Sequence, residues 1–178
     1  MSSDFQHHDD DDIHFYFAYG SNMNAARMQA RVGDTRRRMS GTLEGWQLYF
    51  DKASRIDGVA HANVRKEAGG QVEGVLYELN HPAQIRDMDP FEGHPAEYCR
   101  QVESVDTPDG PRAAWVYVAL PEKTAPGRLP AREYLGHLLE GRDFLSHAYL
   151  ERLGAQHCID SLGDEALLSL GISRTTPG

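Results

Sequence analysis

Short β-type segments joined by hairpin-type turns fill most of the chain, and no regular βαβ alternation runs through it. In 70–80, GQVEGVLYELN, the residues Val75, Tyr77 and Leu79 recur with the period of two that is typical of a strand. Further strands are expected at 14–18, 45–52, 58–66, 97–107 and 111–120. Pro108-Asp109-Gly110 is a strong turn signal that joins the last two as an antiparallel pair.

Helical patterns fall around these strands. They are expected at 23–32, 81–89, 132–141, 146–154 and 164–170. Asn22 or Asn24 can cap the first helix, and Pro90 disfavours a helical Asp89 at the end of the second. Gly20 begins no G-x-G-x-x-G run, which argues against a dinucleotide-binding domain. The pattern predicts an α+β fold, an antiparallel sheet or barrel with helices gathered around it.

Composition narrows the function classes. The length of 178 residues suits one domain, and the net charge of -9 argues against nucleic-acid binding. The basic run at 36–38 is interpreted as a solvated face of a strand. No apolar run approaches the ~20 residues of a membrane span. The two cysteines, Cys99 and Cys158, suggest no disulfide framework, so we expect a cytoplasmic protein.

The N-terminal residues 1–13 include most of the run HHDDDDIH (7–14). Consecutive imidazoles and carboxylates can hold a divalent metal weakly, but they fix no tight geometry. We therefore expect an acidic, histidine-rich disordered tail followed by a single domain over 14–178. The remaining histidines lack metal-ligand spacing, so no metal site is expected.

The segment HFYFAYGSNMN (14–24) ends a buried strand on small, hydrogen-bonding residues. Gly20 permits backbone conformations closed to other residues, and the amides of Ser21, Asn22 and Met23 would lie at a helix N-terminus that favours an anion. A simple helix cap explains these residues equally well.

A second candidate is Glu92, which lies just beyond the expected 81–89 helix and beside Phe91. Partial burial would raise the pKa of a glutamate into a range useful for proton transfer. The alternative is an exposed loop glutamate. Cys99 with His94 is a weaker pair, because Cys99 falls in a strand with nothing to lower its pKa.

Several segments, in this order along the chain, resemble the gamma-glutamylcyclotransferase family. They are FAYGSNMNAARM, VEGVLYELN, MDPFEGHPAEYCRQVES, and REYLGHLLEG with SHAYLERL, together spanning roughly 14–153. The resemblance implies a small mixed, mainly antiparallel β-barrel with flanking α-helices and no cofactor. It also implies a reaction in which a γ-glutamyl amide cyclises to 5-oxoproline and releases an amino acid or amine.

The resemblance also implies site roles. Glu92 falls on the catalytic acid/base. The substrate-binding wall falls on Tyr16, Phe17, Ala18, Tyr19, Gly20, Ser21 and Asn22, with Tyr98 and Tyr134 as aromatic groups around the pocket. The glutathione-specific branch continues differently after Y-G-S, so Asn22 points away from glutathione itself.

The sequence therefore predicts a gamma-glutamylcyclotransferase that acts on a small γ-glutamyl substrate, without nucleic-acid or membrane partners, as a monomer or homodimer. Two alternatives stay open. One is an enzyme of the same fold that removes a γ-glutamyl protecting group or cyclises γ-glutamylamines. The other is a non-catalytic small-molecule binding module.

Overall fold

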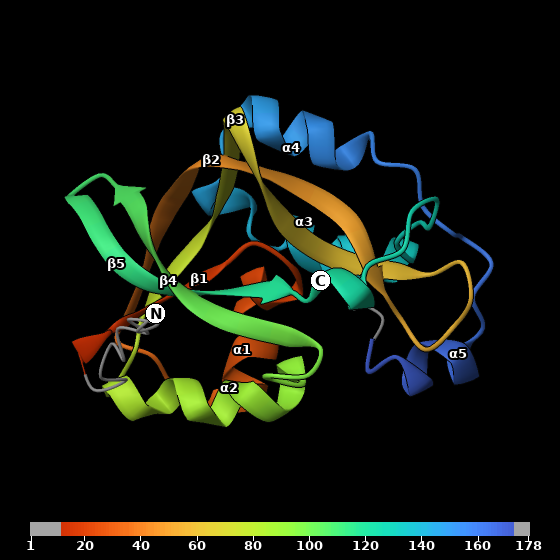
Figure 1. The fold of residues 1–178 in the computed structure, drawn as a ribbon, viewed down its shortest axis with the longest axis horizontal. Coiled ribbons are helices and arrows are strands. Elements are labelled where there is room, and N and C mark those ends of the chain that lie inside the picture. Colours follow the sequence, from red (N-terminus) through yellow and green to blue (C-terminus); the bar gives the residue numbers. More distant parts are fainter. Residues whose placement is uncertain (1–11, 173–178) are drawn as a thin grey trace, which may run out of the picture.

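The computed structural model describes residues 12–172, whose strands close into a barrel in the order β1-β3-β2-β4-β5 (Figure 1). The barrel strands are β1 (Phe15–Ala18), β2 (Arg37–Ala53), β3 (Ala60–Glu78), β4 (Tyr98–Thr107) and β5 (Gly110–Ala119). Neighbouring strands pair antiparallel, except that β1 and β5 pair parallel through Tyr16 and Trp115. The predicted α+β fold, a small mixed and mainly antiparallel barrel with flanking helices, is confirmed.

β2 and β3 are longer than the sequence predicts, because β2 starts at Arg37 and β3 joins the two strands expected at 58–66 and 70–80. The two expected segments are instead joined through a bulge. Gly45 and Gly69 have φ angles of 80° and 79°, which glycine adopts without strain. The pairing register shifts between Glu44 and Trp46, so the hairpin bends without leaving the sheet.

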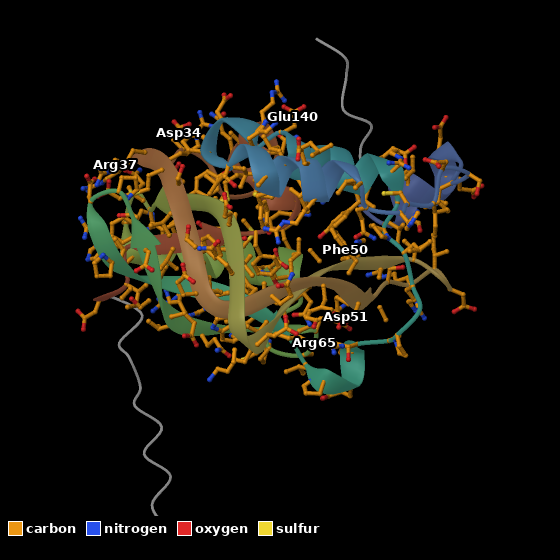
Figure 2. The ribbon with its side chains drawn as sticks, turned by 90° about the horizontal axis from the view of Figure 1, so that it is seen from above. Asp34, Arg37, Phe50, Asp51, Arg65 and Glu140 are labelled. Carbon is orange, nitrogen blue, oxygen red and sulfur yellow. The ribbon has the colours of Figure 1, made fainter. Side chains whose placement is uncertain are left out.

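Beyond the bulge, this hairpin is fastened to β5 by a polar network around the buried Asp51 and Asn63. Arg65 forms an ion pair with Asp51, and the two side chains lie beside each other in Figure 2. Asn63 donates from Nδ2 to Asp51 Oδ1 at 3.0 Å and accepts from the Ala119 amide at 2.9 Å. This network fixes the β3 residues that follow Ala60 against β5.

The helices lie outside the barrel, with α1 and α2 on one side and α4 on the opposite side (Figure 1). They are α1 (Ala25–Val32), α2 (Ile85–Glu92), α3 (Arg132–Leu139), α4 (His147–Gly154) and α5 (Asp164–Ser169). Asn24 caps α1, accepting from the Ala26 and Arg27 amides. No helix in the described part of the chain is long and apolar enough to span a membrane.

α2 corrects the prediction that Pro90 ends this helix at Asp89. The helix runs through Pro90 to Glu92 and ends at Gly93, whose φ of 63° is left-handed. Pro90 lies in the last turn, where its missing N–H removes one bond. Arg100 and Tyr117 hold Asp89 from outside the helix, at 2.9 Å and 2.7 Å from its Oδ1. Glu92 is therefore the last residue of a helix rather than part of a loop.

Phe17 lies at the centre of the barrel and is fully buried. Its ring lies against Gly74 of β3, where an added Cβ would come within 2.4 Å of the Ala18 carbonyl oxygen. Of the predicted tail, residues 1–11 lie outside the described part of the chain, as do residues 173–178 of the predicted domain. Ile13, which the prediction assigns to the tail, is buried in the core.

Candidate active site

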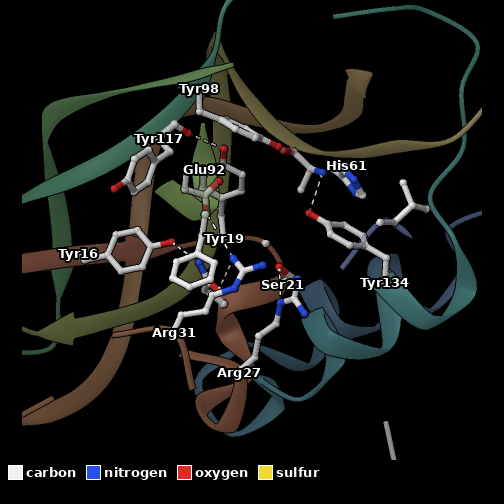
Figure 3. A pocket seen from close by; sticks show the side chains of 15 residues that line it. Tyr16, Tyr19, Ser21, Arg27, Arg31, His61, Glu92, Tyr98, Tyr117 and Tyr134 are labelled. Atoms are coloured by element: carbon white, nitrogen blue, oxygen red, sulfur yellow. Dashed lines mark hydrogen bonds and ion pairs between the residues drawn. The ribbon is translucent and has the colours of Figure 1, made fainter. Parts of the chain in front are cut away.

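A cavity of about 110 Å³ opens where the bend after β1 meets α1, α3 and the end of α2 (Figure 3). The sequence-predicted residues that line it are Tyr16, Tyr19, Gly20, Ser21, Asn22, Glu92, Tyr98 and Tyr134. Phe17 and Ala18 do not line it, because both are buried in the barrel. The structure thus brings the bend after β1 and the end of α2 to one cavity.

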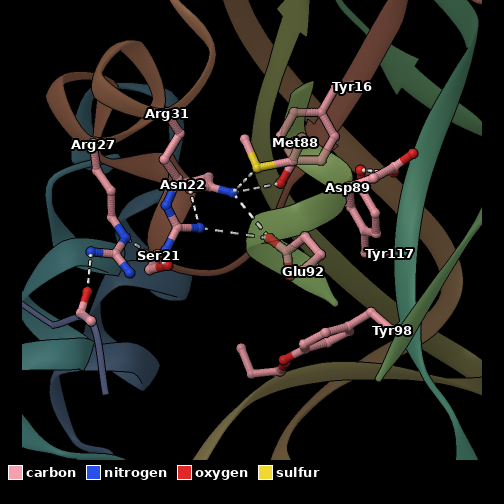
Figure 4. Close-up of polar contacts among 12 residues, drawn as sticks. Tyr16, Ser21, Asn22, Arg27, Arg31, Met88, Asp89, Glu92, Tyr98 and Tyr117 are labelled. Atoms are coloured by element: carbon pink, nitrogen blue, oxygen red, sulfur yellow. Dashed lines mark hydrogen bonds and ion pairs between the residues drawn. The ribbon is translucent and has the colours of Figure 1, made fainter. Parts of the chain in front are cut away.

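Glu92 projects into this cavity with 15% of its side chain exposed. Its Oε1 accepts a hydrogen bond from Asn22 Nδ2 at 3.2 Å and lies 3.9 Å from an Arg31 guanidinium nitrogen (Figure 4). Burial raises the pKa of the Glu92 carboxyl above its ordinary value, and the Arg31 and Arg27 charges offset part of that rise. The carboxyl group is therefore a stronger base than a solvated glutamate, and it remains within reach of an N–H donor.

Asn22 joins the two halves of the site and is 3% exposed. Besides Glu92, its Nδ2 contacts the Tyr16 hydroxyl at 3.0 Å, and its Oδ1 accepts from Arg31 at 3.3 Å. Its backbone carbonyl accepts from the Tyr77 hydroxyl at 2.6 Å. The orientation of this amide is therefore set from several sides.

The bend at Gly20 differs from the expected helix N-terminus. Ser21–Met23 form a short 3₁₀ helix before α1, and the Met23 amide donates to the Gly20 carbonyl at 3.0 Å, so it is already occupied. The φ of Gly20 is −114°, so glycine is not required here for a left-handed backbone. Space is the constraint instead, because an added Cβ would lie 3.2 Å from the Tyr134 hydroxyl.

Two arginines that the sequence reasoning missed face the same cavity. Arg27 donates from Nε to Ser21 Oγ at 3.1 Å and from its terminal nitrogen to the Gly171 carbonyl at 2.8 Å. Burial, with the neighbouring Arg31 charge, lowers the pKa of Arg27 to about 10. Arg27 and Arg31 are four residues apart on one helix, and residues at that spacing share a helix face. This spacing was the signal available in the sequence.

Tyr98 and Tyr134 are both fixed to one residue of β3. The Tyr98 hydroxyl donates to the Ala62 carbonyl at 2.7 Å, and the Ala62 amide donates to the Tyr134 hydroxyl at 2.9 Å. Further lining residues that sequence reasoning did not place in the site are His61, Phe91, Tyr117 and Leu170. The cavity wall is therefore aromatic on several sides, with its charged groups gathered near Glu92.

Comparisons with known proteins agree with this architecture. Residues 16–136 match the family described as gamma-glutamyl cyclotransferase, AIG2-like. No curated protein matches the sequence.

Among solved structures, a human protein, LOC79017, is 22% identical with a TM-score of 0.74, covering 88% of this chain and 97% of its own. A gamma-glutamyl cyclotransferase is 21% identical with a TM-score of 0.73, over 88% of this chain and 97% of its own. A yeast gamma-glutamyl cyclotransferase specific to glutathione is 12% identical with a TM-score of 0.53, over 78% of this chain and 93% of its own. At these identities the likenesses establish the fold, and the match to the family model covers most of the chain. The resemblance seen in the sequence is thus confirmed, and the chain belongs to the AIG2-like gamma-glutamyl cyclotransferase family.

Proposed function

We propose that this protein cyclises a small γ-glutamyl amino acid or amine to 5-oxoproline, with Glu92 as the general acid and base. The observation that carries the proposal is the buried Glu92 carboxylate, which faces Asn22 and two guanidinium groups inside one cavity. Membership of the gamma-glutamyl cyclotransferase family supports a cyclotransferase activity. Perturbed carboxylates in clefts are good candidates for proton transfer.

In the proposed reaction, the α-amine of the substrate attacks its own γ-carbonyl carbon. A C–N bond forms, and the carbonyl electron pair moves to oxygen. Glu92 takes the proton from the attacking nitrogen and gives it to the leaving nitrogen. When the oxyanion collapses, the bond to the leaving nitrogen breaks, giving 5-oxoproline and a free amine, and Glu92 returns to its carboxylate form. No water is consumed.

The cavity suits the geometric demand of this reaction. Nucleophile and electrophile belong to one molecule, so the protein must mainly hold a curled conformation, and well-oriented intramolecular reactions reach effective molarities of ~10⁵ M or more. In the proposal, Arg27 and Arg31 bind the α-carboxylate of the glutamyl head. The Ser21 and Asn22 amides then face the developing oxyanion.

The direct test is release of 5-oxoproline from γ-glutamyl-alanine by the purified protein, followed by chromatography. We expect Glu92→Gln to lower kcat by on the order of 10³-fold while it still binds 5-oxoproline, because proton transfer typically contributes 10²–10⁴-fold. Glu151→Gln, which alters an exposed carboxylate on α4, is the matched control. A Glu92→Gln variant with near-normal turnover would refute the mechanism. Tight binding of γ-glutamyl compounds without turnover would instead favour a binding module.

A further inference from the structure

The cavity has two chemically different sides. Glu92, Tyr16 and Tyr117 lie on one side, and His61 and Tyr134 lie on the other (Figure 3). Every acid or base role in the proposed reaction falls on the Glu92 side. The far side is therefore available to the part of the substrate that does not react.

His61 gives the far side an uncharged ring. Its ring lies 4.8 Å from that of Tyr134, and among the described residues its buried Nδ1 has no hydrogen-bond partner. Burial lowers the pKa of His61 to about 4, with the Lys52 charge adding to the effect, so the imidazole is uncharged at neutral pH. A buried nitrogen without a partner is costly, and because this atom is closed to solvent, the ring offers the cavity an uncharged aromatic surface.

Leu170 supplies an apolar wall from the C-terminal part of the chain. It lines the same cavity and packs partly buried against the core. Its position is fixed on both sides, because Leu167 and Ile172 are each 3% exposed. The next residue, Gly171, accepts the 2.8 Å hydrogen bond from Arg27.

Arg27 connects this segment to the substrate-facing bend, since the same guanidinium donates to Ser21 Oγ at 3.1 Å. The match to the family model ends at residue 136, so Leu170 belongs to a part of the chain beyond that match. Because Leu170 lines the cavity, this segment can shape the pocket from outside the part of the chain that the family model describes.

We propose that His61, Tyr134 and Leu170 form the subsite for the leaving group, and that Leu170 limits the size of the side chain accepted there. The inference rests on the proposed cyclotransferase function. A neutral imidazole, a phenol ring and an aliphatic wall favour a leaving group with a small uncharged side chain. Alanine fits this description, and leucine or phenylalanine exceeds it.

The experiment compares kcat/KM for γ-glutamyl-alanine and γ-glutamyl-leucine in the full chain. Leu170→Ala should raise the leucine-to-alanine ratio by on the order of tenfold, since a methylene in an apolar pocket is typically worth 10- to 200-fold. Leu170→Phe should lower the same ratio. Leu168→Ala is the matched control, because Leu168 lies in the last turn of α5, which Leu170 caps, but is 80% exposed, and it should leave the ratio unchanged.

The two opposed substitutions at residue 170 keep the test decisive if one of them destabilises the protein. Turnover of γ-glutamyl-alanine with a ratio that moves in neither Leu170 variant would overturn this inference alone. Release of 5-oxoproline from neither substrate by the unaltered protein would refute the proposed function, and this inference with it.

Discussion

The side-chain nitrogen Nδ2 of Asn22 lies 3.2 Å from Glu92 Oε1, so the bend after β1 donates a hydrogen bond directly to the end of α2. The residues are 70 positions apart in the chain. The hydrogen bond favours the ionised carboxyl group and opposes the effect of burial on the pKa of Glu92. Asn22 thus links the position of the carboxylate to its basicity.

Replacing Asn22 should therefore move the acid limb of the pH–rate profile upward. Asn22→Ala removes the donor, so the pKa of Glu92 rises and a higher pH is needed to ionise the base. Asn22→Asp should move the limb further, because it places two carboxylates side by side. We expect kcat/KM near neutral pH to fall by on the order of 100-fold in either variant, since a misplaced group costs about that much. An acid limb that stays fixed in both variants would contradict the assignment.

Glu92→Gln should make the protein at least as stable as the unaltered chain at pH 7. The folded pKa of Glu92 is raised, so its contribution to stability is present below the ordinary value of about 4.3 and is lost as pH rises through the folded pKa. A glutamine side chain does not ionise, so the variant does not lose this stability as the pH rises. Chemical denaturation from pH 4 to pH 8 should show the advantage of the variant growing with pH. The prediction fails if the advantage is larger at pH 4 than at pH 8, and Glu151→Gln again serves as the control.

The arginine pair should make binding depend on a carboxylate. Arg27 and Arg31 are neighbouring cations, and burial and the Arg31 charge lower the pKa of Arg27 to about 10, so an anion between them relieves repulsion. We expect 5-oxoproline to raise the melting temperature, and 2-pyrrolidinone, which lacks the carboxylate, to have little effect at equal concentration. Arg27→Gln should weaken the 5-oxoproline effect by about tenfold in Kd. Arg152→Gln on α4 should not, and an equal response to both compounds would count against this role.

Gly74→Ala should destabilise the barrel strongly. The new methyl group would meet the Ala18 carbonyl oxygen at 2.4 Å and the Phe17 ring at 2.8 Å, both fixed in the core. The expected loss is about 3 kcal/mol in the free energy of unfolding, the upper end for overpacking. Gly154→Ala at the end of α4, with nothing within 4 Å, should be neutral or up to ~1 kcal/mol more stable. Urea denaturation of the two variants makes the comparison, and equal stabilities would show that the barrel can expand at Gly74.

The strand pattern was predictable because the alternation in 70–80 reports directly which face is buried. The continuity of β2 and β3 was not, since glycines such as Gly45 and Gly69 are compatible with either a strand end or a bulge, and only the paired backbone shows the bulge. The course of α2 was missed for a related reason. Tertiary bonds from Arg100 and Tyr117 to Asp89 outweigh the local effect of Pro90.

The candidate site was predictable where the chemistry lies in one short motif, such as the YGSN bend or the segment around Glu92. Arg27 and Arg31 lie on the helix that follows the bend. Their place in the site depends on which face α1 presents to the cavity. Leu170 left no local signal, because it reaches the cavity through tertiary packing of a segment held by the buried Leu167 and Ile172 and by the Arg27 bond to Gly171.

The parallel pairing of β1 with β5 determines when the barrel around this cavity can close. The Tyr19 hydroxyl donates to the Tyr117 carbonyl across 98 positions, so β1 and the bend after it wait for β5. At about 5–20 residues per second, that delay is on the order of 5 to 20 seconds of synthesis. During translation the bend after β1 thus precedes the closed barrel, and the cavity is complete only once Tyr134 and Leu170, which also line it, have followed.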